Sequence, residues 1–172
     1  MTAPPSHYEL VVIGAGPAGH KAAVQASKAG HSVLLVDRAA APGGECVHRG
    51  TIPSKTLRES ALYLTGLKQR AAGIASSELT AHTKVESLMK RLDHVLHAHE
   101  KFIRSQTERN GIEFQRGRVR FLGPHELELA QPSGGKRRIT SDLFVIASGS
   151  RPRAPAEMQI DHEQILDSDC GR

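Results

Sequence analysis

The spacing of apolar side chains predicts a strand, a helix and a second strand in the first part of the chain. Residues 8–13 form a short, β-branched apolar run of the buried-strand type. A glycine-rich break at 14–19 precedes an alanine-rich segment of helical character, and Gly30 suits the end of that helix. Residues 32–36 repeat the buried-strand pattern and end at Asp37. Two such strands joined by one helix predict a parallel pair.

The middle of the chain is predicted to be mainly helical. Residues 39–50 contain several glycines and are expected to form a loop. Thr51 is expected to cap a helix that runs towards Lys68. A weakly structured connection at 73–81 leads to a segment, 82–110, whose apolar positions recur at helical spacing.

Alternating apolar and polar positions then predict short strands. Val119 and Phe121 are expected on one face of a strand, with arginines on its solvated face. The pattern continues at 125–129 and 137–140, and a further buried strand is expected at 143–147. These segments predict a small β-meander after the helices.

Composition narrows the class of protein. The chain has 172 residues, 38% of them hydrophobic and 24% charged, which suits one globular domain. No apolar run is long enough to cross a bilayer, and the first residues do not resemble a secretory signal. We therefore expect no membrane partner and a cytoplasmic location.

Charge and cysteine usage exclude several kinds of site. The net charge is +5, but the charges are scattered and aromatic residues make up only 3%, so no nucleic-acid partner is expected. Cys46 and Cys170 are two lone thiols and predict neither a disulfide scaffold nor a zinc site. Three histidines in one predicted helix provide no third ligand on a shared face, so no metal is expected. They are His94, His97 and His99.

A glycine motif carries the first chemical signal. Residues 14–19 read Gly-Ala-Gly-Pro-Ala-Gly, follow a predicted strand and open a predicted helix, and Asp37 ends the next strand. In this context the motif predicts a dinucleotide-binding turn. The first glycine permits the tight turn, the second leaves room for a pyrophosphate, and the third allows the helix to pack near the strand. The helix N-terminus attracts the phosphates, and Asp37 is expected to accept hydrogen bonds from the adenosine ribose.

A second segment resembles a known family. Residues 43–55, Gly-Gly-Glu-Cys-Val-His-Arg-Gly-Thr-Ile-Pro-Ser-Lys, are similar to the flavin-facing segment of the pyridine nucleotide-disulfide oxidoreductases. Many members have two cysteines here, forming a redox disulfide beside FAD. This chain has Cys46 at the first position and Thr51 at the second. A hydroxyl cannot form a disulfide, so dithiol–disulfide exchange is disfavoured.

The segment most resembles the soluble, Si-specific pyridine nucleotide transhydrogenases, which keep one cysteine. That resemblance implies FAD as cofactor and transfer of reducing equivalents between NADPH and NAD. It places Lys55 near the flavin N5, where a cation would stabilise the reduced flavin. Cys46 is either catalytic or an inert buried thiol, and His48 is interpreted as a structural or solvent-facing histidine.

A third segment extends the resemblance over most of the chain. Residues 144–152 are similar to the family's strand followed by a small-residue turn near the FAD diphosphate, and Gly117 to a glycine beside the adenine. The implied fold class is α/β, a Rossmann-like FAD-binding domain with parallel sheet, crossover helices and β-meander. The implied catalytic residues are Lys55 and Cys46. The implied cofactor-binding residues are Gly14, Gly16, Pro17, Ala18, Gly19, Asp37, Arg38, Gly43, Gly44, Glu45, Cys46, Thr51, Ser54, Lys55, Gly117, Ala147, Ser148 and Gly149.

The resemblance also implies a domain organisation. Residues 1–172 correspond to the N-terminal part of the FAD-binding domain, and about 151–172, with Asp167-Ser168-Asp169, to the crossover towards an NAD(P)-binding domain. No second glycine motif or Gly-Asp dipeptide follows. We therefore expect a split or truncated enzyme that is inactive alone and needs a complementing C-terminal chain or a homodimer. Two alternatives remain: a dihydrolipoamide dehydrogenase-like fragment without the redox disulfide, or a non-catalytic flavin-binding half.

Overall fold

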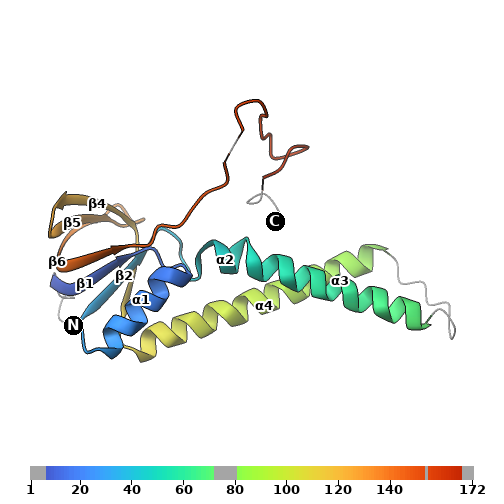
Figure 1. Ribbon diagram of the computed structural model, residues 1–172, viewed down its shortest axis with the longest axis horizontal. Coiled ribbons are helices and arrows are strands. Elements are labelled where there is room, and N and C mark those ends of the chain that lie inside the picture. Colours follow the sequence, from blue (N-terminus) through green and yellow to red (C-terminus); the bar gives the residue numbers. More distant parts are fainter. Residues whose placement is uncertain (1–6, 72–80, 154, 168–172) are drawn as a thin grey trace. The chain divides into compact units, whose positions relative to one another are not determined.

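A computed structural model shows that the chain forms two compact units (Figure 1). The first unit contains the chain up to Gly44 together with Glu100–Arg151, and the second contains Glu45–His99 and the chain from Pro152 onwards. The structure describes residues 7–71, 81–153 and 155–167, with side chains outside 67–71 and 81–84.

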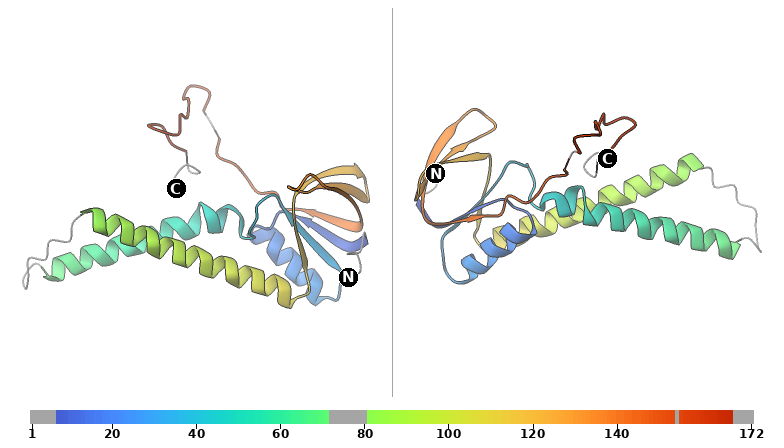
Figure 2. Two further views of the ribbon diagram at one scale, coloured as in Figure 1. Left: turned by 180° about the vertical axis from the view of Figure 1, so that it is seen from behind. Right: turned by 45° about the horizontal axis from the view of Figure 1, so that its top comes forward.

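The first unit is built on a six-stranded mixed sheet. Its strand order is β3-β2-β1-β6-β5-β4. β1 pairs in parallel with β2 and β6, and β2 pairs in parallel with β3. β4, β5 and β6 pair antiparallel, so the meander continues the same sheet (Figures 1 and 2). The strands are β1 (His7–Ile13), β2 (Val33–Asp37), β3 (Glu113–Arg116), β4 (Arg118–Gly123), β5 (Glu126–Ala130) and β6 (Lys136–Ile146). This sheet confirms the predicted α/β fold class.

Both faces of the parallel strands are buried, which explains their continuous apolar sequences. Helix α1 (Pro17–Lys28) covers one face, where Ala23 and Val24 pack with Val12 and Leu35. On the other face, Val11 and Leu34 pack with residues of β5 and β6. The β5 and β6 residues in this second cluster are Leu127, Leu129 and Ile139.

Strand β6 differs from the prediction of two separate strands at 137–140 and 143–147. It is continuous over Lys136–Ile146 and changes partner along its length. Residues 136–140 pair with β5, whereas residues 140–146 pair with β1. Ser141 and Asp142 appear as a polar break in the sequence, yet Ser141 is buried. Its burial is tolerated because its Oγ donates a hydrogen bond to Leu143 O and its N–H donates one to His125 O.

The second unit contains helices, and here two predictions were wrong. Part of the expected loop at 39–50 is a short helix, α2 (Gly44–His48). Thr51 is not a cap but the first residue of α3 (Thr51–Ala71), and Ser54 N–H donates to Gly50 O at 3.2 Å. Residues 81–99 of helix α4 (Ala81–Arg109) lie alongside α3 in both figures, with Leu92 and Leu96 buried (Figures 1 and 2).

The long helix predicted at 82–110 is confirmed by α4, and Gly111 follows it with a φ of 65°. Most of the connection predicted at 73–81 lies outside the described residues, as do Ser168, Asp169 and Cys170. Among the described helices, none has both the length and the apolar character needed to cross a membrane.

Candidate functional site

The glycine motif forms the turn between β1 and α1, and the surroundings of its three glycines differ. Gly14 has a φ of 109°, and a Cβ there would lie 2.2 Å from Ala147 O. A Cβ on Gly19 would lie 1.8 Å from Gly14 O. Gly16 has an ordinary φ of −71°, and its Cβ would meet no atom closer than Gly44 Cα at 3.9 Å. Packing therefore requires Gly14 and Gly19, whereas the space beside Gly16 is left open by the protein.

Helix α1 begins directly at this open space. Gly16 is its N-cap and provides no side-chain cap, and Pro17 occupies the first turn. Pro17 and Ala18 are exposed. A helix start without a side-chain cap presents backbone N–H groups and a partial positive charge, which suits an anion such as a diphosphate.

Asp37 lies at the end of β2 and faces the glycine turn. Its Oδ2 accepts a hydrogen bond from Ala15 N–H at 2.6 Å, and its Oδ1 accepts one from Ala39 N–H at 2.9 Å. Each carboxylate oxygen can accept a further hydrogen bond. The carboxylate is therefore held beside the turn while keeping capacity for ribose hydroxyls. Its neighbour Arg38 is exposed.

A second glycine pair packs against the first turn. Gly43 N–H donates to Ala15 O at 2.8 Å. Gly44 has a φ of 61°, and a Cβ on it would lie 2.8 Å from Gly16 Cα. The close approach of the two backbone segments explains the glycine at position 44, and the φ of 130° at Gly43 favours glycine there.

The end of β6 completes this group. Ala147 N–H donates to Ile13 O at 2.8 Å, and its carbonyl oxygen is the atom that a Cβ on Gly14 would meet. Ser148 and Gly149 follow as exposed residues, and Gly149 has a φ of 72°. Three segments distant in sequence therefore meet at the carboxyl end of β1 and β6, where open α/β sheets bind their ligands.

Gly117 has a packing explanation of its own. Its N–H donates to Asp37 O at 2.8 Å, which places it beside the end of β2. A Cβ there would lie 2.5 Å from Leu129 Cδ1 and 2.6 Å from Ala130 O. The glycine is thus required by the sheet whether or not an adenine lies nearby, and its predicted contact with adenine stays a prediction.

The remaining predicted residues belong to the second unit. They lie on α2 and at the start of α3: Glu45, Cys46, Thr51, Ser54 and Lys55. Cys46 is half-buried with a free thiol, and Glu45 pairs with Arg49 at 3.7 Å. Lys55 is exposed. The roles predicted for these residues stay predictions.

One residue of the first unit was missed in the sequence. His20 follows Gly19 on α1, is 5% exposed, and has no hydrogen-bond partner for its Nε2 among the described residues. Its spacing of three and four residues from Ala23 and Val24, which are also buried, is the sequence signal that could have predicted its burial. Elsewhere in the described part of the chain, no group of three or more metal-ligating side chains is present.

The fold and this turn define a Rossmann-like dinucleotide-binding domain. The model of the pyridine nucleotide-disulphide oxidoreductase family matches residues 8–170, and the chain belongs to this family. It is 42% identical over 163 residues to a soluble pyridine nucleotide transhydrogenase of Mycobacterium bovis, and 33% identical over 164 residues to one of Vibrio vulnificus. These matches cover 94% and 95% of this chain but 35% of each relative, so the chain spans about a third of their length.

Solved structures agree with this assignment. The crystal structure of LpdA from Mycobacterium tuberculosis superposes with a TM-score of 0.78 at 26% identity, over 94% of this chain and 36% of that one. The flavoprotein disulfide reductase RclA of Escherichia coli shares the fold, with a TM-score of 0.66 at 24% identity over 87% of this chain and 30% of its own.

FAD is the cofactor of this family, and the first unit fits its adenosine diphosphate part. The space beside Gly16, the helix start without a side-chain cap and the Asp37 carboxylate supply the three features that such a group needs. Fold class, family and cofactor were therefore correctly predicted from the sequence.

Proposed function

We propose that this chain is the FAD-binding part of an oxidoreductase that transfers reducing equivalents between NADPH and NAD. The observation that carries the proposal is the open space beside Gly16. Neither the backbone conformation nor the packing of the protein requires a glycine at this position. The 42% identity to a soluble pyridine nucleotide transhydrogenase supports the reaction. Bound FAD would supply the two-electron carrier between the two nucleotides.

Each part of the chain has a role in this proposal. The N-terminus of α1 binds the diphosphate and Asp37 orients the ribose. Lys55 provides a cation for the reduced flavin, and Cys46 has no cysteine at the position of the family's second thiol, because Thr51 stands there and cannot form a disulfide. Transfer would then need no thiol relay, in contrast to a disulfide reductase.

The proposal includes a further requirement. Because the chain spans about a third of its relatives, we expect the nicotinamide site to be supplied by further sequence, by a complementing chain or within a homodimer. The 172-residue chain alone should bind FAD weakly and transfer no hydride. We place the protein in the cytoplasm.

The test is a titration of the purified chain with FAD, followed by flavin fluorescence. Gly16→Ala should weaken FAD binding by roughly tenfold or more, about 1.4 kcal/mol, because its Cβ occupies the diphosphate space. Its circular dichroism and melting temperature should match those of the wild type, since the nearest protein atom is 3.9 Å away. Gly123→Ala is the matched control, because its Cβ would meet nothing within 4 Å.

Two results would contradict the proposal. Either the wild-type chain fails to bind FAD, or Gly16→Ala binds it as tightly as the wild type does. A complemented enzyme that reduces a disulfide substrate in a Cys46-dependent manner, and not NAD, would favour the dihydrolipoamide dehydrogenase-like alternative.

A further inference from the structure

The peptide group between Arg38 and Ala39 is hydrogen-bonded at both of its polar atoms. Its N–H, which belongs to Ala39, donates to Oδ1 of Asp37 at 2.9 Å. Its carbonyl oxygen, which belongs to Arg38, accepts a hydrogen bond from Nε of Arg116 at 3.3 Å. Because a peptide group is planar, holding its carbonyl also fixes the direction of its N–H. The guanidinium of Arg116 is therefore linked to the Asp37 carboxylate through this one peptide.

Arg116 reaches this peptide from the end of the edge strand β3. In the parallel pairing of β2 with β3, it stands opposite Asp37. The next residue, Gly117, donates its N–H to the carbonyl oxygen of Asp37 at 2.8 Å, so the backbone of the two strand ends is joined without the arginine side chain. Arg116 itself is exposed. Loss of its side chain should therefore release the peptide after Asp37 and leave the sheet in place.

The direction of that peptide matters for the carboxylate. Oδ2 of Asp37 is held separately by Ala15 N–H at 2.6 Å, whereas Oδ1 depends on the Ala39 N–H. With one N–H on each oxygen, the remaining lone pairs have defined directions and can accept further hydrogen bonds. If the peptide rotated, its carbonyl oxygen would face Oδ1 and repel it. A group that is fixed before binding loses less conformational freedom when the ligand arrives.

We propose that Arg116 is a cofactor-positioning residue, which holds the Arg38–Ala39 peptide so that Asp37 is oriented for the hydroxyls of the adenosine ribose. This rests on the proposed function, because it requires a ribose at Asp37. The hydrogen bond to Arg38 is present in the free chain. The role of Arg116 is thus to preorganise the carboxylate, and no contact between its side chain and the cofactor is needed.

The first experiment titrates the wild type and three variants with FAD, ADP and 2′,3′-dideoxy-ADP, which has no ribose hydroxyls. Arg116→Met should weaken FAD and ADP binding by about 3–10-fold, the effect of one hydrogen bond. It should leave the affinity for the dideoxy analogue unchanged, since that ligand makes no hydrogen bond with Asp37. Arg116→Lys keeps a cationic donor and should recover part of the loss. Arg120→Met is the matched control, because it removes the same charge from an exposed position on β4.

The second experiment needs no ligand. Amide hydrogen exchange, measured by NMR on the free proteins, should be faster at Ala39 in Arg116→Met than in the wild type, because the peptide is no longer held at its carbonyl. The N–H of Gly14, which donates to Val36 O at 2.7 Å, should keep its wild-type rate. Faster exchange at both positions would show a general loosening of the strand ends and would contradict the inference.

The outcomes separate this inference from the proposed function. If the wild type binds FAD and ADP but Arg116→Met binds them equally well, the inference fails and the proposed function stands. The same holds if Arg116→Met loses affinity for ADP and its dideoxy analogue to the same extent, or if exchange at Ala39 does not change. If the wild type binds neither FAD nor ADP, both fail.

Discussion

At the scale of single residues, substitutions of the motif glycines can distinguish positions needed for packing from the position proposed to face the ligand. Gly19→Ala would place a Cβ 1.8 Å from Gly14 O, a backbone atom that cannot move without distorting the turn. We expect the free energy of unfolding to fall by roughly 1–3 kcal/mol or more, the range for overpacked positions. Urea denaturation measures this change. Gly16→Ala is the control, and an equal loss of stability in both variants would show that the turn is not packed as described.

These glycines were identified from the sequence, but the contact that requires each of them was not. The motif and its strand–turn–helix context predicted where a diphosphate would bind. It did not show that Ala147 closes on Gly14, or that Gly44 approaches Gly16, because these contacts join segments far apart in the chain. His20 was missed for the same reason, since the absence of a partner for its Nε2 depends on everything packed around it.

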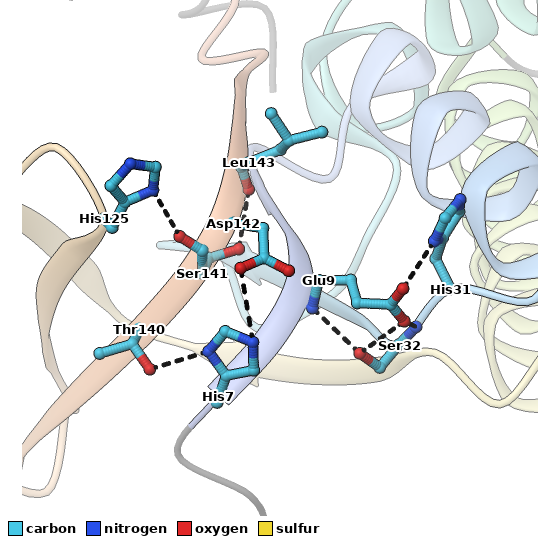
Figure 3. A network of polar contacts seen from close by, with 9 residues as sticks. All are labelled: His7, Glu9, His31, Ser32, His125, Thr140, Ser141, Asp142 and Leu143. Atoms are coloured by element: carbon cyan, nitrogen blue, oxygen red, sulfur yellow. Dashed lines mark hydrogen bonds and ion pairs between the residues drawn. The ribbon is translucent and has the colours of Figure 1, made fainter.

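Glu9 provides a prediction of pH dependence at the opposite end of β1 (Figure 3). Its carboxylate binds His31 Nδ1 at 2.9 Å and Ser32 N–H at 2.7 Å. The hydrogen bond with His31 first, and that with Ser32 next, lower the pKa of Glu9 to about 2 from its usual 4.5. A carboxyl with a lowered folded-state pKa stabilises the fold above its unfolded pKa, and this contribution is lost as pH falls through the folded value.

We therefore expect Glu9→Gln to be less stable than the wild type at pH 7. The difference should shrink as pH falls below about 4.5 and disappear below about pH 2, where the wild-type carboxyl also becomes protonated. Urea denaturation of both proteins across this range provides the measurement. A stability difference that stays constant with pH would show that the charge of Glu9 has no part in it.

At the scale of secondary-structure elements, a half-buried polar network joins three strands of the first unit. Tyr8 of β1 donates its hydroxyl to Glu113 of β3 at 2.5 Å, and Arg137 of β6 lies 3.4 Å from the same carboxylate. Arg137 also donates to the Tyr8 hydroxyl at 3.3 Å. Burial, followed by the hydrogen bond to Glu113, raises the pKa of Tyr8 to about 12. The network connects β6 to the edge strand β3.

Arg137→Met should therefore destabilise the protein more than Arg138→Met does. Arg137 is 20% exposed, and its removal leaves Glu113 with one charge partner fewer, whereas Arg138 is 76% exposed beside Glu126. We expect a difference of about 1–2 kcal/mol between the two variants, allowing for partial solvent screening. Chemical denaturation measures it. Equal effects would mean that the network adds nothing to the pairing of the strands.

Elements with strong local patterns were predicted well, and those that depend on distant partners were not. The helices at 17–28 and 81–109 have long apolar stripes and clear glycine ends. Helix α2 has only five residues, too few for a periodicity, and it begins at Gly44, the second of two glycines with positive φ. β6 exists as one strand because β1 continues to pair with it after β5 ends, which no local pattern contains.

At the scale of the whole molecule, the second half of β6 is an incompletely paired edge. Among the described residues, Leu143–Ile146 pair with β1 alone, because the pairing with β5 ends at Thr140. Two large apolar side chains on this segment are mostly exposed, Leu143 at 66% and Ile146 at 67%. Unpaired strand edges with exposed apolar side chains promote association between chains.

We expect the 172-residue chain to self-associate as its concentration rises, and the double substitution Leu143→Lys and Ile146→Lys to suppress this. Two positive charges on an edge oppose pairing with a second copy, while the cost to stability should be small because both positions are exposed. Sedimentation velocity over a concentration series measures the association. Leu62→Lys is the control, since Leu62 is 51% exposed but lies on helix α3, which is no part of the sheet. If Leu62→Lys suppressed association equally, general surface hydrophobicity would be the cause, and the edge of β6 would have no special part in it.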